Sequence, residues 1–483
     1  MSSDRITETH PTAAAGQHRQ PGATPASNPP HGRSMSSDRI TETRPAGAAI
    51  RRHAAVTASG AADSQRRPGA TAADNPAHGG LLRARPGDGA EPKKVFESDR
   101  SLFPRHVGGR PDIDLESGKY LKLWQGPQHP GITGNMSLEL TVSGDEVVEC
   151  KTHVGYLHRG FEKLMEQRLY IQNFPLVCRI CVPEPDFNEY LYAACVEDLA
   201  GIEVPEKANW LRVLTLEMAR LTSFLMWTGG QGGSLGMGTV GQWTLVHRDY
   251  MLDLFEELSG GRIYHMYIIP GGVRGDLPDG WTGRLEATLK RVEKLLDEVE
   301  LVMMHNAVLK GRLKGLGLID PAMVEHYGIT GPNARGSGVR RDIRKDQPYL
   351  GYDRLDFEVI TREEGDAYAR LGVRIDEMRQ SIDLIRQIVA RIPARGEIHH
   401  PLPNVLHWRI PAGQTWHRSE STRGEYGYMM VSDGTEKPRR VYVKGPSYTH
   451  AMAVMEDLAV NTNIADIAAL MVSLHTYPPE VER

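Results

Sequence analysis

Residues 124–130 read Trp-Gln-Gly-Pro-Gln-His-Pro, and residues 153–163 read His-Val-Gly-Tyr-Leu-His-Arg-Gly-Phe-Glu-Lys. Between them, apolar side chains alternate with polar ones over residues 136–142, and Ser-Gly-Asp at 143–145 supplies a turn before Val147. This pattern is typical of a β-hairpin. The hairpin is predicted to hold two histidine-bearing loops beside each other.

Three later segments repeat apolar residues at helical spacing, at residues 211–225, 285–303 and 368–385. Gly311 and Pro393 follow the last two segments as stop signals. No stretch of the chain is continuously apolar over the roughly 18 residues that a membrane span needs. The three segments therefore predict a buried helical bundle.

The fold class is predicted as α+β, with a small N-terminal β-sheet on a central helical bundle. The β part is expected at about residues 119–160 and the bundle at about 190–395, with the helical pattern starting after Ala193. Residues 396–483 are expected to form an irregular C-terminal segment that contains one strand, at 439–444.

Residues 1–94 precede this body of residues 95–483. They are rich in Ala, Pro, Gly, Ser, Thr and Arg, and residues 1–9 recur at 35–43. Such a segment cannot bury enough apolar surface to offset the entropy of ordering, which predicts a disordered, duplicated tail. The tail carries a net charge of +5 and the whole chain −4, which leaves about −9 on the body. Neither value predicts nucleic-acid binding.

Composition limits the class of protein. Hydrophobic residues make up 40% and charged residues 24%, as in globular proteins. No apolar segment follows Met1, so no signal peptide is expected. Four cysteines in 483 residues argue against a disulfide framework and fit a reducing cytoplasm. Of these, Cys150 and Cys195 are expected to be small buried hydrophobes in a strand and a helix.

Two motifs could carry chemistry of their own. Residues 236–241 match the dinucleotide pattern G-x-G-x-x-G, but a predicted helix precedes them where a strand is required, so close helix packing is favoured. Cys178-Arg-Ile-Cys181 has no second ligand pair at zinc spacing, and two ordinary buried thiols are favoured. His129 lies between Pro127 and Pro130 in a rigid loop that suits proton delivery.

The body resembles the D-type subunit of the NADH–quinone oxidoreductase family, respiratory complex I, which is itself related to the large subunit of nickel–iron hydrogenases. The matching stretches, in the family's order, are residues 126–130, 155–163, 199–205, 252–257, 270–273, 276–280, 330–333, 352–357, 374–380 and 431–434.

The resemblance implies a hydrogenase large-subunit-like fold and a peripheral location on the cytoplasmic side of the cell membrane. It implies no redox centre in this chain. The expected partners are the adjoining iron–sulfur subunit with its terminal 4Fe–4S cluster, other peripheral-arm subunits and membrane-arm subunits. Together with the iron–sulfur subunit, the chain would enclose quinone as substrate and couple electron transfer from NADH to proton translocation. The chain is not expected to be active alone.

The resemblance also assigns site residues. His129 and Arg159 match the family's loop histidine and the arginine near the cluster, and they are the candidate catalytic residues. Three quinone-pocket positions differ from the family: Thr133 stands where it has a second histidine, Val182 where it has the quinone-bonding tyrosine, and Ser234 where it has an aspartate. The chain is therefore predicted to be a divergent copy.

The hydrogenase motifs align only in part. Of the four metal-binding thiolates, Cys181 is kept, while Glu184, Tyr477 and Glu480 occupy the other positions. A nickel–iron site needs all four, so no metal is expected. Three hypotheses stay open: a quinone-reducing complex I subunit, a subunit of a related membrane-bound ion-translocating oxidoreductase with another acceptor, and a scaffold subunit without quinone chemistry.

Overall fold

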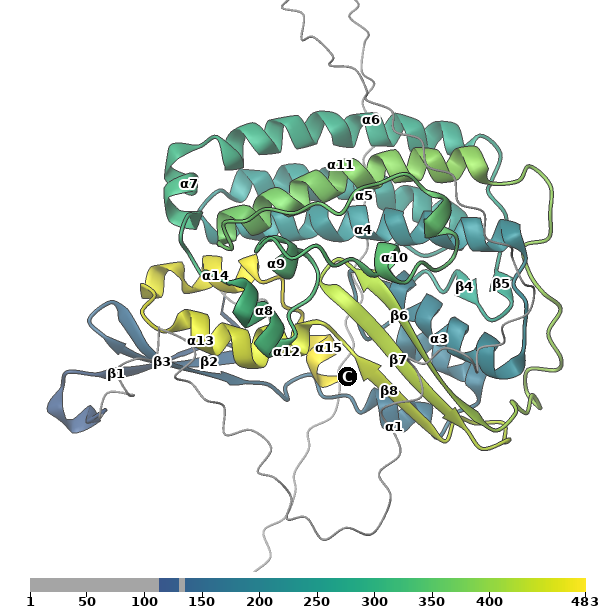
Figure 1. Cartoon of the computed structure of the whole chain (residues 1–483), viewed down its shortest axis with the longest axis horizontal. Helices are drawn as coiled ribbons and strands as arrows, with labels where there is room; N and C mark the ends of the chain where they lie inside the picture. Colours follow the sequence, from purple (N-terminus) through teal and green to yellow (C-terminus); the bar gives the residue numbers. More distant parts are fainter. Residues whose placement is uncertain (1–112, 130–134) are drawn as a thin grey trace, which may run out of the picture. The chain divides into compact units, whose positions relative to one another are not determined.

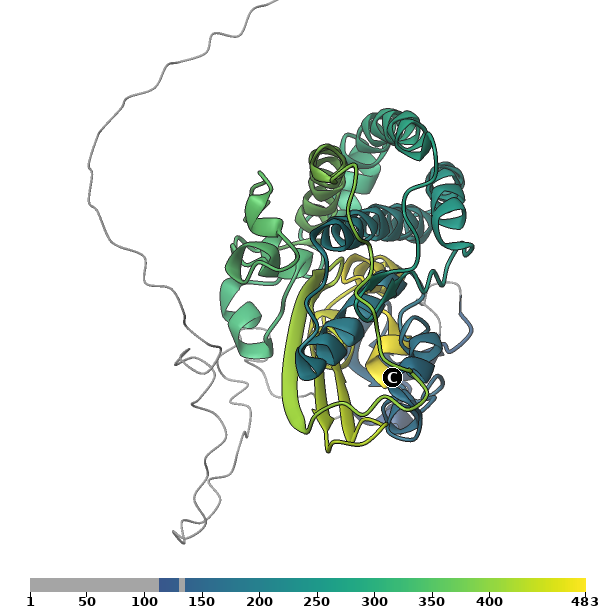
Figure 2. The ribbon, with the colours of Figure 1, turned by 90° about the vertical axis from the view of Figure 1, so that its right-hand side faces the viewer.

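The computed structural model describes residues 113–129 and 135–483, so the prediction for the tail at 1–94 lies outside the described residues. Four long helices form a bundle, and a three-stranded sheet with one further helix lies beneath it (Figure 1). Figure 2 shows the long helices nearly end-on, with the yellow-green strands below them. The predicted α+β class is confirmed.

The predicted hairpin is present as β2 (Ser137–Ser143) and β3 (Glu146–His153), and β1 (Leu121–Gln125) pairs with β2 to make an antiparallel sheet. The apolar residues of β2 point into the core, because Leu138, Leu140 and Val142 are all buried. The hairpin turn bonds to the C-terminal part of the chain, at residues 461–464.

The bundle consists of α4 (Glu206–Ser234), α5 (Gly238–Ser259), α6 (Trp281–Val299) and α11 (Ala367–Arg391). Helices α4 and α5 approach each other through glycine. A Cβ at Gly229 would lie 2.6 Å from the Thr244 hydroxyl, and one at Gly232 would lie 2.8 Å from the Val240 Cβ. The glycine-rich segment therefore serves close helix packing, as predicted.

The C-terminal segment is not irregular, and this prediction was wrong. Strands β6 (Gly413–Ser421), β7 (Gly424–Ser432) and β8 (Arg440–Lys444) form an antiparallel sheet in sequence order. Helix α3 (Pro185–Ala200) packs against β6 and β7. Only β8 was predicted, since β6 is too polar in sequence to show the usual alternation.

Short elements complete the described chain. Around the first sheet and α3 they are η4 (Leu115–Ser117), α1 (Phe161–Met165), η5 (Tyr170–Asn173), α2 (Phe174–Val177), β4 (Ile268–Ile269) and β5 (Gly272–Val273). Between α6 and α11 they are η6 (Glu300–Met304), α7 (Ala307–Leu313), α8 (Pro321–Tyr327), α9 (Pro332–Arg335), α10 (Ile343–Asp346) and η7 (Tyr352–Arg354). The chain ends with α12 (Ser447–Thr449), η8 (His450–Val454), α13 (Met455–Ala459), η9 (Ile464–Asp466), α14 (Ile467–Ser473) and α15 (Pro478–Glu482).

A buried network of charged side chains joins α9 to α11 and β6. Arg335 on α9 donates from Nε to Glu377 on α11 and from Nη1 to Glu420 on β6, each over 2.7 Å. Arg344 donates to Asp342 over 2.7 Å and to Glu217 on α4 over 3.2 Å. Removing one partner from such a pair typically costs about 3–5 kcal/mol, because it leaves a buried charge uncompensated.

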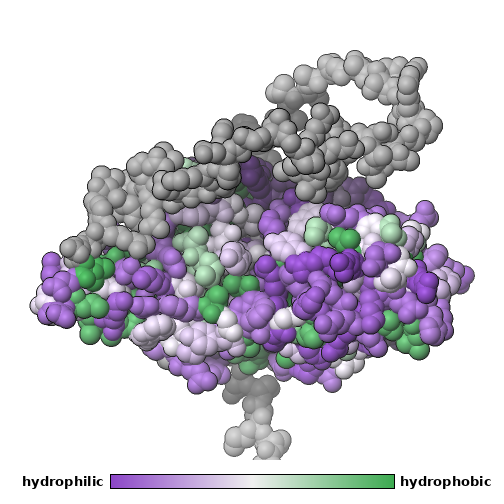
Figure 3. Space-filling model, turned by 90° about the horizontal axis from the view of Figure 1, so that it is seen from below, coloured by the Kyte–Doolittle hydropathy of each residue, from purple (hydrophilic) through white to green (hydrophobic). Residues whose placement is uncertain are grey.

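The surface of the described body is mainly polar on the face shown in Figure 3, where hydrophobic side chains occur in small scattered groups. In residues 113–129 and 135–483, no helix combines the length and hydrophobicity required to cross a membrane.

Candidate functional site

Arg159 lies in the loop between β3 and α1, where its guanidinium is partly buried. Its Nη1 donates a 3.0 Å hydrogen bond to the Arg179 carbonyl, and its Cζ lies 4.2 Å from the centre of the Phe161 ring. Its Nε and Nη2 are buried without a hydrogen-bond partner among the residues described. Burial lowers the pKa of Arg159, while Tyr477 and Tyr264 act in the opposite direction. Two donors of a cation are thus left for an acceptor outside the described residues.

The loop that carries Arg159 is fixed by the last helix of the chain. The Leu157 N–H donates to the Glu482 carboxylate over 2.6 Å, and His158 Nδ1 lies 2.7 Å from the Glu482 carbonyl oxygen. Beyond Gly160, Glu162 on α1 accepts from the Arg483 guanidinium over 2.8 Å. Residues more than 300 positions apart therefore set where Arg159 lies.

Val182 lies in the turn before α3, three residues after Arg179, whose carbonyl receives Arg159. Its side chain has no proton to give. Its backbone interacts with Tyr477, and burial raises the pKa of that phenol, so the phenol stays neutral. The Arg159–Arg179 hydrogen bond thus joins the two segments that carry Arg159 and Val182, and the place of both residues in one quinone pocket stays a prediction. The structure also places Tyr477 beside this turn, which was not predicted. The sequence had only aligned Tyr477 with a position of the hydrogenase motif.

His129 follows β1 and is exposed. Thr133 lies outside the described residues, so its predicted place in the pocket stays a prediction. Ser234 is the last residue of α4 and is half-buried; its hydroxyl donates to the Gln231 carbonyl over 2.8 Å and lies 3.4 Å from Gln231 Nε2. Gln231 Nε2 in turn lies 3.3 Å from the Ala469 carbonyl on α14. The Ser234 side chain therefore bonds locally, at the end of its own helix.

Four positions that align with hydrogenase metal ligands meet around one guanidinium. Arg423 Nη1 lies 3.0 Å from Cys181 Sγ, 3.0 Å from Glu184 Oε2 and 3.5 Å from Glu480 Oε2, and the Tyr477 ring centre is 4.9 Å from its Cζ. The carboxylates and the guanidinium are fully buried. The sequence alignment identified the four aligned positions, Cys181, Glu184, Tyr477 and Glu480. It did not identify Arg423, which occupies the centre of the cluster.

The other candidate motifs carry no separate chemistry. Cys178 and Cys181 are free and buried, as are Cys150 on β3 and Cys195 on α3, which confirms these predictions. In the ranges 113–129 and 135–483, no group of three or more His, Cys, Asp or Glu side chains is arranged to hold a metal ion. Residues 236–241 lead from α4 into α5, so no strand precedes the glycines as a dinucleotide site requires.

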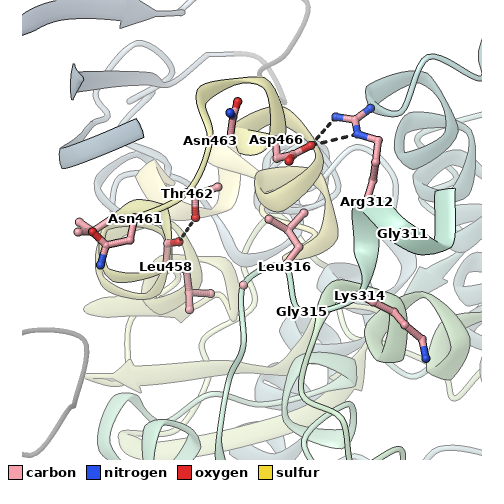
Figure 4. Close-up of a pocket in the computed structure, with 12 residues that line it drawn as sticks. Gly311, Arg312, Lys314, Gly315, Leu316, Leu458, Asn461, Thr462, Asn463 and Asp466 are labelled. Carbon is pink, nitrogen blue, oxygen red and sulfur yellow. Dashed lines mark hydrogen bonds and ion pairs between the residues drawn. The ribbon is translucent and has the colours of Figure 1, made fainter. Parts of the chain in front are cut away.

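A pocket of about 520 Å³ lies elsewhere, between residues 311–317 and 458–466 (Figure 4). At its edge, Arg312 donates to Asp466 over 2.6 Å, while Lys314 extends away from the other labelled side chains. Its charged groups are thus already paired or turned away. The two buried donors of Arg159 that have no partner among the described residues lie outside this pocket.

Comparison with known proteins supports the resemblance. The family model of the respiratory-chain NADH dehydrogenase 49 kDa subunit matches residues 234–408 and 399–483. The NADH-quinone oxidoreductase D-type subunit of Thermosipho melanesiensis is 45% identical over 365 residues, which cover 75% of this chain and 99% of that protein. The F420H2 dehydrogenase D-type subunit of Methanosarcina mazei is 37% identical over 374 residues, covering 76% and 99%.

A solved structure also matches. A chain of the membrane-bound sulfane sulfur reductase, an archaeal respiratory membrane complex, is 41% identical with a TM-score of 0.74, and the match covers 76% of this chain and 99% of that one. The predicted resemblance to the complex I family is thereby confirmed. The chain belongs to the family of the 49 kDa subunit of respiratory-chain NADH dehydrogenase, an oxidoreductase family with members in related membrane-bound complexes.

Proposed function

We propose that this chain forms the electron-acceptor side of a complex I-type membrane-bound oxidoreductase, beside a 4Fe–4S cluster held by an adjoining subunit, and that the acceptor is quinone. The observation that carries the proposal is Arg159: two of its guanidinium nitrogens are buried and have no acceptor within the described chain. A fixed cation with free donors suits the edge of a cluster that gains negative charge on reduction.

The chain's own residues would divide the work. Arg159 stabilises the reduced state of the neighbouring cluster by its charge. His129 and the hydroxyl of Tyr477 supply protons as the acceptor is reduced, since Val182 offers none. The chain binds peripherally to membrane-arm subunits, on the cytoplasmic side, and electron transfer is coupled there to proton translocation. Both the iron–sulfur subunit and the membrane arm are required for activity.

A second candidate is an acceptor other than quinone. Two of the altered pocket positions favour it. The Val182 side chain has no proton to donate, and the Ser234 hydroxyl donates its hydrogen bond to the Gln231 carbonyl of its own helix. A relative with 41% identity belongs to a complex named for reduction of sulfane sulfur. The second candidate keeps Arg159 and Tyr477 in the same roles and replaces only the molecule that receives the electrons.

The test is Arg159→Met in the assembled complex, with the reduction potential of the adjoining cluster measured by redox titration. Loss of the cation should lower the potential by on the order of tens of millivolts, because a unit charge several ångströms away in a partly buried site contributes that much. Arg284→Met, which removes an exposed arginine paired with Glu257, is the matched control and should leave the potential unchanged.

An unchanged reduction potential of the adjoining cluster in the Arg159→Met variant would contradict the proposal. Turnover of the wild-type complex then decides between the acceptors. Reduction of quinone supports the first candidate. Electron flow to a sulfur compound, with no reduction of quinone, supports the second.

A further inference from the structure

Among the described residues, the Arg159 guanidinium depends on Arg179 for its hydrogen bonding. Its Nη1 donates to the Arg179 carbonyl over 3.0 Å, while its Nε and Nη2 are buried without a partner in that part of the chain. A long side chain with several free torsions keeps one direction only if the group that holds it keeps its place. The contacts that fix Arg179 therefore also fix the direction of the Arg159 cation.

The guanidinium of Arg179 is held by a ring and two polar groups. Its Cζ lies 4.5 Å from the centre of the Tyr264 ring. Its Nη1 donates to the Pro175 carbonyl over 2.9 Å and lies 3.2 Å from Cys178 Sγ. Pro175 and Cys178 belong to the same short segment as Arg179. The Tyr264 ring is thus the contact that ties this guanidinium to a segment distant in sequence.

The loop that carries Tyr264 is itself fixed to α3. The side chain of Glu189 accepts the backbone N–H groups of residues 266–268, at distances of 2.6, 2.9 and 3.2 Å. His265 Nδ1 lies 2.9 Å from Asp186, in the first turn of the same helix. Helix α3 begins shortly after the segment of Arg179, so both partners of the stack are anchored to one rigid element.

We propose that Tyr264 is a positioning residue of the acceptor site: its ring holds Arg179, whose carbonyl directs the Arg159 guanidinium toward the adjoining cluster. The inference rests on the proposed function of Arg159. Tyr264 acts through Arg179 and needs no contact with the acceptor. A guanidinium is attracted to the face of an aromatic ring by the ring's own charge distribution, so the ring is the active part of Tyr264 and its hydroxyl is not required.

Two substitutions separate the ring from the hydroxyl. In the assembled complex, Tyr264→Leu removes the ring and should lower the reduction potential of the adjoining cluster. The shift should have the same sign as that of Arg159→Met and be smaller, because the cation stays present and loses only its direction. Tyr264→Phe keeps the ring and should keep the wild-type potential. Tyr250→Leu is the matched control: it removes a ring 4.9 Å from the Arg291 guanidinium on α6, and no shift is expected.

Cys178 supplies a readout that does not depend on the cluster. Its thiol is fully buried and lies 3.2 Å from the Arg179 guanidinium. In the full chain, Tyr264→Leu should release this guanidinium and raise the rate at which a thiol reagent labels Cys178. Tyr264→Phe should leave the rate unchanged. Cys195 on α3 is also fully buried and should stay protected in both variants, which shows that the fold is intact.

A double substitution tests the order of action. When Arg179→Met is already present, Tyr264→Leu should lower the cluster potential no further, because the ring has lost the group that it holds. A further decrease as large as the one that Tyr264→Leu causes alone would mean that Tyr264 acts on the cluster without Arg179, and the proposal would be wrong.

The remaining outcomes separate this proposal from the proposed function. Unchanged labelling of Cys178 in Tyr264→Leu would overturn the positioning role. So would a potential at or above the wild-type value in Tyr264→Leu when Arg159→Met lowers it. If Cys178 becomes accessible in Tyr264→Leu while Arg159→Met leaves the potential unchanged, Tyr264 holds Arg179 as inferred and the proposed function fails.

Discussion

His265 is a buried histidine on the loop before β4, and it is held by a carboxylate. Its Nδ1 lies 2.9 Å from Asp186 at the start of α3, and its ring stacks on Phe255 at 3.8 Å. Burial opposes the charge of His265, but Asp186 more than compensates and raises its pKa. Glu189, one turn further along α3, has its pKa raised to about 8 by burial and by Asp186.

These shifts predict a pH dependence of stability. A histidine whose pKa is raised on folding stabilises fully below its unfolded pKa, about 6.5, and loses that contribution as pH rises through the folded value. The free energy of unfolding of the wild-type protein should therefore exceed that of the His265→Gln variant by the largest amount at pH 6. This difference between the two proteins should shrink by pH 9. His407→Gln removes an exposed histidine and should show no such trend. Denaturant unfolding at several pH values measures both. A difference that grows with pH would contradict the assignment.

Single residues also mark the limit of sequence reasoning. Arg159 and Val182 were predicted to share a site because both lie in short segments that align with the family's pattern, and the Arg159–Arg179 hydrogen bond joins those segments. Nothing in the sequence around Arg423 indicated that this residue belongs to the site. It follows the end of β6 in what reads as an exposed turn, and its burial depends on partners at Cys181 and Glu480, which are distant in sequence.

Among the elements, those with one buried face were predicted best. Helix α6 buries one face, which includes Leu285, Leu289 and Val292, and the β2–β3 hairpin alternates apolar and polar residues, so both sequences show the pattern. Helix α3 begins at Pro185, before the predicted start after Ala193. Its start was missed because residues 185–197 are all buried and no polar face marks the turns. Strand β6 was missed because its buried residues include Ser419, Glu420 and Ser421, which serve the polar core.

The α4–α5 contact predicts opposite effects for two adjacent glycines. A Cβ at Gly232 would lie 2.8 Å from Val240, whereas a Cβ at Gly233 meets nothing within 4 Å. Gly232→Ala should destabilise by about 1–3 kcal/mol through overpacking. Gly233→Ala should stabilise by roughly 0.5–1 kcal/mol, because alanine loses less backbone entropy in a helix. Thermal unfolding of the two variants compares them directly, and equal effects would show that the helices do not pack through this position.

At the scale of the whole body, the end of the chain closes the site. The last helix, α15, is buried along its length and contacts three distant segments. Glu480 bonds to Ser447 and pairs with Arg423, Glu482 receives the Leu157 N–H, and Arg483 pairs with Glu162. The loop of Arg159 and the turn of Cys181 are thus both held by residues 477–483. This closure was not predictable from local pattern, since its contacts span about 300 residues of sequence.

Removal of residues 478–483 should therefore open the site without unfolding the bundle. Arg423 loses one of its two carboxylates, the Arg159 loop loses its anchor, and Cys181, which is fully buried, becomes accessible to a thiol reagent. Cys195 on α3 lies against β7 through its 3.5 Å contact with the Tyr428 carbonyl, and it should stay protected, which separates local opening from global unfolding. Removal of Arg483 alone deletes one partly exposed ion pair with Glu162, generally worth about 0–1 kcal/mol, and should leave Cys181 protected. Mass spectrometry of the labelled chains reads out both cysteines. Labelling of Cys195 at the same rate as Cys181 in the chain that lacks residues 478–483 would mean that α15 supports the whole fold and not only the site.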